Sequence, residues 1–121
     1  MQQVMNITKA LADETRVRLL LALEGREVCV CQLIELVDMA PSTVSKHLSL
    51  LRMAGLIEGR KEGRWMHYRH AGDDAPSVVR EALTWVRTAL RKDKTVVADS
   101  RRLAVVLKQD AAELSRRQCC R

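Results

Sequence analysis

The stretch from Val28 to His70 restricts the fold more than any other part of the chain. Hydrophobic residues recur at helical spacing in Val28–Val37 and again in Pro41–Gly55, and a short polar break separates the two runs. The next stretch, Leu56–His70, has the pattern of two strands around a basic, glycine-containing tip. This order of elements predicts a winged helix-turn-helix, a mainly α-helical (α+β) fold with a small β-hairpin wing.

The second of these helices has an outer face suited to DNA. Val44, Leu48 and Leu51 recur at i, i+4 and i+7, so we expect them to face the core. The opposite face carries small hydroxyl-bearing and cationic side chains, which fit a major groove. These candidate DNA contacts are Ser42, Thr43, Ser45, Lys46, Ser49 and Arg52.

The wing supplies a second basic element. Arg60, Lys61 and Arg64 flank Gly59 and Gly63, so we expect the tip to turn tightly and these cations to approach the phosphate backbone. The aromatic and histidine side chains of the wing are not counted among these DNA contacts. We place Trp65 and Tyr68 in the core, and His67 and His70 in solvent rather than on a metal.

The composition favours a small, basic DNA-binding domain. With 121 residues the chain can build one modest core, and with aromatic residues at 2% most of the buried area must come from Leu, Val and Ala on helices. The formal net charge of +6 indicates an anionic partner, for which nucleic acid is a common choice. Because the chain has no leader pattern and no apolar run that could span a bilayer, we expect a cytoplasmic protein without membrane contact.

The C-terminal part carries a wide apolar stripe on a long predicted helix. A stripe poor in aromatic residues fits a helix contact between subunits, so we predict a homodimer whose interface also includes the first helix. The stripe consists of Val79, Leu83, Val86 and Leu90. We assign residues 1–92 to a DNA-binding and dimerisation domain and residues 93–121 to a helical extension with a Cys-Cys tail. Within the extension we expect one helix from near Thr95 to about Arg117.

Several motifs together are similar to one known family. They are the run Val28-Cys29-Val30-Cys31 opening one helix, Pro41–Leu51 as the next helix, Gly55-Leu56-Ile57, a wing ending in Tyr68, and upstream Lys9–Arg16. Over roughly residues 5–92 the chain resembles the ArsR family of metal-responsive repressors. The resemblance implies a repressor that binds double-stranded operator DNA, with Ser45 and His47 at base edges and Tyr68 packed in the wing.

Cys29 and Cys31 are the candidate sensor. In a reducing compartment, cysteines more often bind metal or sense redox state than form structural disulfides. Side chains two apart on a helix diverge by about 200°, so we expect an ion held by both sulfurs to distort the first turn of that helix. This helix precedes the DNA-reading helix, so the distortion would couple the metal to DNA binding.

The cysteines favour trivalent arsenic or antimony as the inducer. Two thiolates leave a three-coordinate As(III) or Sb(III) one ligand short. Arsenic sensors of the resembling family often take a third cysteine further along the same helix, but here Ile34 stands at that position. We therefore expect the third ligand from Cys119 or Cys120. Neighbouring arginines in the sequence favour the thiolate form of both cysteines.

Three alternatives stay open. Cd(II) or Pb(II) bound by all four thiolates is compatible with the donor set, because soft thiolates discriminate weakly among soft metals. A thiol-redox switch of DNA binding is the second alternative, and a constitutive DNA-binding protein with inert thiols is the third. Zinc is disfavoured by the resemblance, because zinc sensors use His on the long C-terminal helix and Ala75–Lys92 contains none. With no Cys-X-X-Cys and no nucleophile–base set, we do not expect an enzyme.

Overall fold

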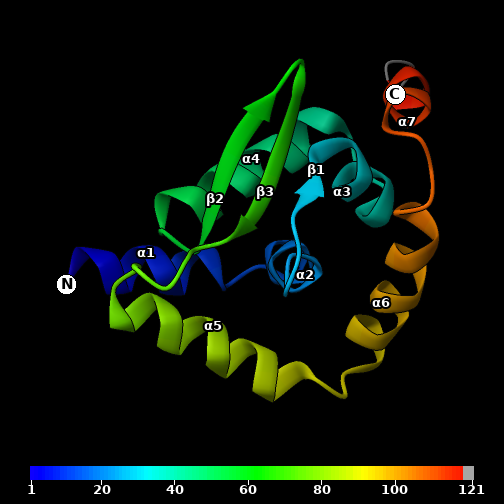
Figure 1. Cartoon of the computed structure of the whole chain (residues 1–121). Helices are drawn as coiled ribbons and strands as arrows, with labels where there is room; N and C mark the ends of the chain where they lie inside the picture. Colours follow the sequence, from blue (N-terminus) through cyan, green and yellow to red (C-terminus); the bar gives the residue numbers. More distant parts are fainter. Residues whose placement is uncertain (119–121) are drawn as a thin grey trace.

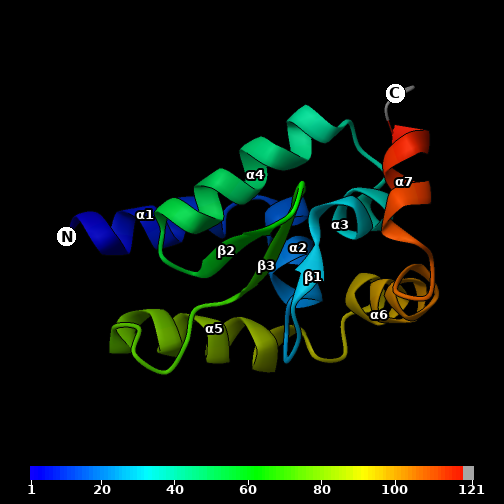
Figure 2. The ribbon, with the colours of Figure 1, turned by 45° about the horizontal axis from the view of Figure 1, so that its top comes forward.

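The computed structural model describes residues 1–118, which form seven helices and three strands (Figure 1). The helices are α1 (Gln2–Ala10), α2 (Glu14–Ala22), α3 (Val30–Val37), α4 (Pro41–Met53), α5 (Ser77–Leu90), α6 (Lys94–Val106) and α7 (Ala111–Gln118). The strands are β1 (Val28–Cys29), β2 (Ile57–Glu62) and β3 (Trp65–His70). Figures 1 and 2 show α4 and the β2–β3 hairpin on one side of the molecule and α5 on the other.

The helix-turn-helix is formed by α3 and α4, as the sequence predicts. A left-handed residue, Asp38, ends α3 with a φ of 53°, and Pro41 begins α4 in the first helical turn, where its missing N–H breaks no hydrogen bond. Three side chains of α4 are fully buried against the core, namely Val44, Leu48 and Leu51. The predicted inward face of the DNA-reading helix is therefore confirmed.

The wing is a β-hairpin within a three-stranded antiparallel sheet of order β1-β3-β2. Glu62 pairs with Trp65 at the end of the hairpin, and Gly63, with a φ of +62°, forms the tight turn. Gly59 lies within β2 rather than at the tip, and a Cβ there would stand 3.0 Å from the Tyr68 ring. The prediction for Gly63 is thus confirmed, whereas Gly59 serves close packing under the wing.

The first part of the predicted α3 is a strand. Val28 and Cys29 form β1, with Val28 opposite Tyr68 and Cys29 opposite His67 in β3. Helix α3 begins only at Val30. The hydrophobic run did not reveal this, because a two-residue strand depends on a partner about forty positions away along the chain.

The C-terminal extension folds back onto α3. The single helix expected from Thr95 to Arg117 is divided into α6 and α7 by a break at residues 107–110, and both helices pack against α3. Buried side chains anchor them, namely Leu103, Val106 and Leu114. Helix α6 is also joined to α2, because the guanidinium of Arg18 donates to both carboxylate oxygens of Asp99 at 2.8 and 3.0 Å.

The apolar stripe of α5 is used largely within the chain itself. Val79 and Val86 are only 0% and 4% exposed, so both are already covered within the chain itself, and their assignment to a subunit contact stays a prediction. Leu83 and Leu90 are half-buried, whereas the neighbouring Trp85 is 66% exposed. Helices within residues 1–118 are all too short or too polar to cross a membrane.

Candidate thiol site and DNA-reading surface

Cys29 and Cys31 stand together at the start of α3. Cys29 is the N-cap residue, with an extended backbone (φ −69°, ψ 144°), and Cys31 lies in the first turn. Both are almost completely buried, at 3% and 2% exposed, and their Sγ atoms are 2.9 Å apart. The expected divergence of about 200° does not arise, because Cys29 is not helical. The prediction that one ion could reach both sulfurs only by distorting the helix is therefore wrong.

The environment of the pair favours one thiolate. The hydrogen bond between the two sulfurs lowers the pKa of Cys29 to about 6 and raises the pKa of Cys31, because the two groups share one proton. The sulfur of Cys29 also accepts the backbone N–H of Gln32, and it lies at the positive end of the α3 dipole. The first proton therefore leaves the pair readily, while the second needs a strong competitor such as a metal ion.

Helix α7 covers the thiols. Leu114, which is fully buried, packs with Val106 against Cys29 and Cys31. At the end of the helix, the side-chain amide of Gln118 is buried and donates to the carbonyl oxygen of Cys31 at 2.7 Å. The sequence carried no signal for Gln118, because a polar residue near a terminus resembles any solvated one.

Two cysteine thiols lie within residues 1–118. Cys29 and Cys31 are close enough for one soft ion to contact both, since metal–sulfur bonds are about 2.3 Å long. Within this part of the chain, no group of three or more Cys, His, Asp or Glu is arranged to hold a metal ion. The other two predicted ligands, Cys119 and Cys120, lie outside the described residues and directly follow Gln118 in the sequence.

The thiols adjoin two elements of the DNA-reading region. Helix α3, which begins between the two cysteines, packs against α4. Strand β1, which contains Cys29, pairs with β3 of the wing, so that Cys29 stands opposite His67. The second connection was missed by sequence reasoning, because it depends on the β1–β3 pairing.

The outer face of α4 matches its prediction in exposure. The predicted contacts with exposed side chains are Ser42, Thr43, Ser45, Lys46, Ser49 and Arg52. His47 differs from them, because it is half-buried and its Nδ1 lies 3.3 Å from the Arg16 guanidinium, which itself donates to the carbonyl oxygens of Ala10 and Lys9. The assignment of this face to DNA stays a prediction.

The basic residues of the wing are not equivalent. Arg60 forms ion pairs with Glu27 and Glu62, and it lowers the pKa of Glu27 through their hydrogen bonds. Lys61 and Arg64 are exposed, and the Arg64 guanidinium lies 5.8 Å from the centre of the Trp65 ring. Lys61 and Arg64 are therefore better placed than Arg60 to meet a phosphate.

The remaining ring side chains of the wing divide between core and surface. Tyr68 is buried in the main core, as predicted. Trp65 is partly buried and packs against the small cluster formed by Cys29, Cys31, Val106 and Leu114. His70 is not solvated as expected, because its Nε2 lies 2.5 Å from the Leu20 carbonyl oxygen and its burial lowers its pKa. The alternating pattern of β3 was a possible signal for this burial, since His70 shares a face with Tyr68.

The helix-turn-helix matches a known sequence family. Residues 13–58 match the family described as bacterial regulatory protein, arsR family. The chain is 50% identical over 62 residues to the arsenical resistance operon repressor of Escherichia coli K12, which covers 50% of this chain and 53% of that protein. It is 40% identical over 80 residues to an arsenic resistance transcriptional regulator of Pseudomonas putida KT2440. This match covers 64% of this chain and 68% of that protein.

The fold is also similar to a solved structure. A homodimeric winged helix-turn-helix DNA-binding domain from Mycobacterium bovis superimposes with a TM-score of 0.61 at 34% identity, over 74% of this chain and 82% of that one. The match to the Escherichia coli repressor spans only about half of its length. The family match lies on the helix-turn-helix, and the similarities to these three proteins cover between 50% and 74% of this chain.

Proposed function

Because the chain belongs to the ArsR family of bacterial regulatory proteins, we propose that it is a homodimeric transcriptional repressor that leaves its operator when As(III) or Sb(III) binds its cysteine thiolates. The observation that carries this proposal is the buried Cys29–Cys31 pair, with its sulfurs 2.9 Å apart at the start of α3. The similarity to arsenical-resistance regulators supports the choice of ion. Family and fold are those of DNA-binding regulators rather than enzymes.

The third ligand in this proposal comes from Cys119 or Cys120. Support comes from Gln118, whose hydrogen bond to the Cys31 carbonyl brings the end of the described chain to the thiols. Cys119 and Cys120 are the next two residues in the sequence. Soft thiolates suit trivalent arsenic and antimony, and a fourth sulfur would suit Cd(II) or Pb(II) instead.

Release of DNA follows from the position of Cys29 and Cys31 between two reading elements. A bound ion replaces the shared proton and fixes the separation of the two sulfurs, so it acts at once on β1 and on the start of α3. Strand β1 is paired with the wing and α3 is packed against α4, so either element can be shifted relative to DNA. The ion and the operator would then favour different arrangements of one protein, which is the requirement for allosteric coupling.

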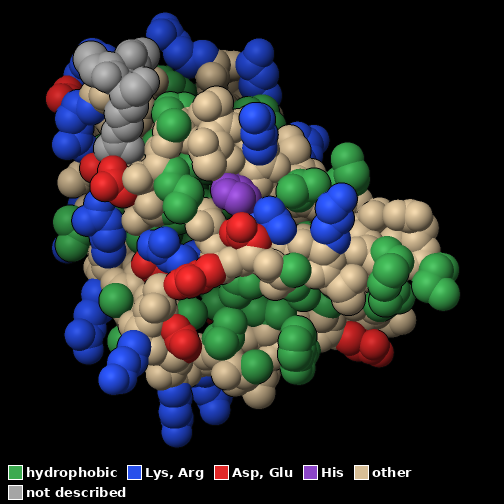
Figure 3. Space-filling model, turned by 180° about the vertical axis from the view of Figure 1, so that it is seen from behind, with side chains coloured by type: hydrophobic (Ala, Val, Ile, Leu, Met, Phe, Trp, Pro, Cys, Tyr) green, Lys and Arg blue, Asp and Glu red, His purple; other side chains and the backbone are tan. Residues whose placement is uncertain are grey.

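Dimerisation is proposed through α1 and the exposed face of α5. Met5 and Val4 of α1 and Trp85 of α5 are exposed hydrophobic side chains. Figure 3, which shows the molecule from behind, has hydrophobic side chains gathered in its lower middle and toward its right-hand end, where the half turn brings the α1 end of Figure 1. Exposed apolar patches of this kind commonly mark protein contacts, and the Mycobacterium bovis neighbour is homodimeric.

The test is a thiol-variant series assayed by arsenite-triggered operator release with reductant present. We expect Cys29→Ser and Cys31→Ser to bind the operator normally, since both side chains are buried away from the outer face of α4, but not to respond to arsenite. The double variant Cys119→Ser, Cys120→Ser should respond only at higher arsenite concentration. Ser115→Ala on α7 is a matched control that removes a hydroxyl without removing a thiol.

Two outcomes would contradict the proposal. Wild-type release by the Cys29→Ser, Cys31→Ser double variant would show that these thiols do not carry the response. Release of the wild-type protein by an oxidant, but not by arsenite under reducing conditions, would favour a thiol-redox switch. Titration with Cd(II) in parallel distinguishes a four-thiolate site, because that ion should then depend on Cys119 and Cys120 together.

A further inference from the structure

A pocket of about 550 Å³ lies between α2, α5 and α6, away from the thiols. Figures 1 and 2 place α5 and α6 on the side of the molecule remote from α4 and the wing tip. The residues around this pocket therefore take no part in the DNA-reading surface or the thiol site described above. Its volume is in the range of pockets that hold small organic ligands.

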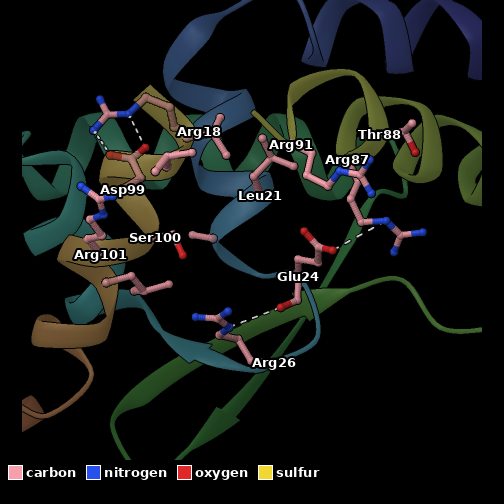
Figure 4. A pocket seen from close by; sticks show the side chains of 14 residues that line it. Arg18, Leu21, Glu24, Arg26, Arg87, Thr88, Arg91, Asp99, Ser100 and Arg101 are labelled. Atoms are coloured by element: carbon pink, nitrogen blue, oxygen red, sulfur yellow. Dashed lines mark hydrogen bonds and ion pairs between the residues drawn. The ribbon is translucent and has the colours of Figure 1, made fainter. Parts of the chain in front are cut away.

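The polar wall of this pocket is strongly basic (Figure 4). It contains five arginines, namely Arg18, Arg26, Arg87, Arg91 and Arg101, against two carboxylates, Glu24 and Asp99. The Asp99 carboxylate accepts hydrogen bonds from Arg18, and Oε1 of Glu24 lies 3.6 Å from Nε of Arg87. Five cations and two anions leave a formal charge of +3 around one cavity.

Arg91 and Arg101 are the free cations of the wall. Neither has a hydrogen bond or ion pair with another residue of the described chain, and they line the pocket from the C-cap of α5 and from α6 respectively. Guanidinium groups around one cavity repel one another, so an anion between them would lower the electrostatic energy. Arginine is also well suited to phosphate and carboxylate groups, which it can bind through two parallel hydrogen bonds.

Apart from the hydroxyl-bearing Thr88 and Ser100, the rest of the lining is apolar. Leu21 and Ala22 of α2 face Val96, Val97 and Leu103 of α6. A bare inorganic ion would leave this surface without a partner, whereas a ligand with a hydrophobic body would cover it. We propose that the pocket binds a small organic anion, with its phosphate or carboxylate group at Arg91 and Arg101 and its apolar body against α2 and α6.

The experiment is a titration of the full-length protein followed by the amide signals of its ¹⁵N spectrum. The probes are phenyl phosphate and benzoate, with inorganic phosphate and phenol as the separate halves of the ligand. We expect saturable shifts at the pocket residues with at least one of the two aromatic anions, and much weaker binding of inorganic phosphate or phenol. Either aromatic anion supports the site, and the tighter one identifies the preferred acidic group.

The variant pair tests the assigned arginines. Arg91→Ala with Arg101→Ala should weaken binding about tenfold or more, because a hydrogen bond to a charged group contributes enough free energy for a factor of that order. Lys92→Ala with Lys108→Ala removes the same charge from exposed positions outside the pocket and should change little. The proposal is overturned if both double variants lose affinity equally, if inorganic phosphate binds as tightly as the aromatic anions, or if shifts are spread over all basic surfaces.

Discussion

Truncation of Leu114 should open the thiol site without unfolding the protein. Leu114 is fully buried against Cys29, Cys31 and Val106, and a buried Leu→Ala change typically costs about 2–5 kcal/mol. Helix α7 has only eight residues and packs mainly on α3, so this loss falls on the docking of α7 rather than on the main core. Taking the lower figure, the undocked population should rise about 30-fold, since each 1.4 kcal/mol is a factor of ten.

The assay is the alkylation rate of Cys29 and Cys31, followed by mass spectrometry on a Cys119→Ser, Cys120→Ser background. Since both thiols are buried under α7, their alkylation requires α7 to undock from α3. We therefore expect Leu114→Ala to accelerate the alkylation about 30-fold. Val105→Ala, a truncation at a 59% exposed position of α6, is the matched control and should leave the rate unchanged. An unchanged rate in Leu114→Ala, with operator binding intact, would show that α7 does not shield the thiols.

Three further predictions concern DNA, assembly and pH. Lys46→Ala and Arg64→Ala should each weaken operator binding and flatten its salt dependence by about one unit per lost phosphate contact, and an unchanged slope in titrations at several salt concentrations would remove them from the interface. Trp85→Glu should dissociate the dimer, because it places a charge in the proposed apolar contact, and sedimentation as a dimer would contradict that interface. Burial lowers the pKa of His70 below 6.5, so the unfolded chain binds this proton more readily than the folded one. The free energy of unfolding should therefore fall as the pH drops below about 6.5, and His70→Gln should reduce that dependence in denaturant titrations.

The helix-turn-helix and the wing were predictable because their signals are local. The inward positions of α4, the proline at its start and the glycine at the wing tip each depend on periodicity or on the backbone preference of one residue. The outer face of α4 follows from the same periodicity. His47 departs from it because of Arg16, which lies on a different element.

The stripe on α5 shows where periodicity stops being informative. Val79 and Val86 have the spacing of a buried face, and both are buried within the single chain, Val79 as part of its main core. Hydrophobic spacing predicts that a face is covered and carries no information about what covers it. Trp85, on the exposed side of the same helix, appeared in no predicted interface.

The sequence by itself determined the fold class, the position of the DNA-reading helix and the selection of Cys29 and Cys31 as the candidate sensor. Each of these depends on residue type and spacing within one segment. Only the tertiary structure decided that the two sulfurs meet without distortion of a helix, since Cys29 is held extended by pairing with a strand far along the chain. The same holds for Leu114 and Gln118, which reach the thiols from the end of the described chain. Contacts between residues so distant in sequence arise only when several elements pack together, and no local pattern of hydrophobic or polar residues encodes them.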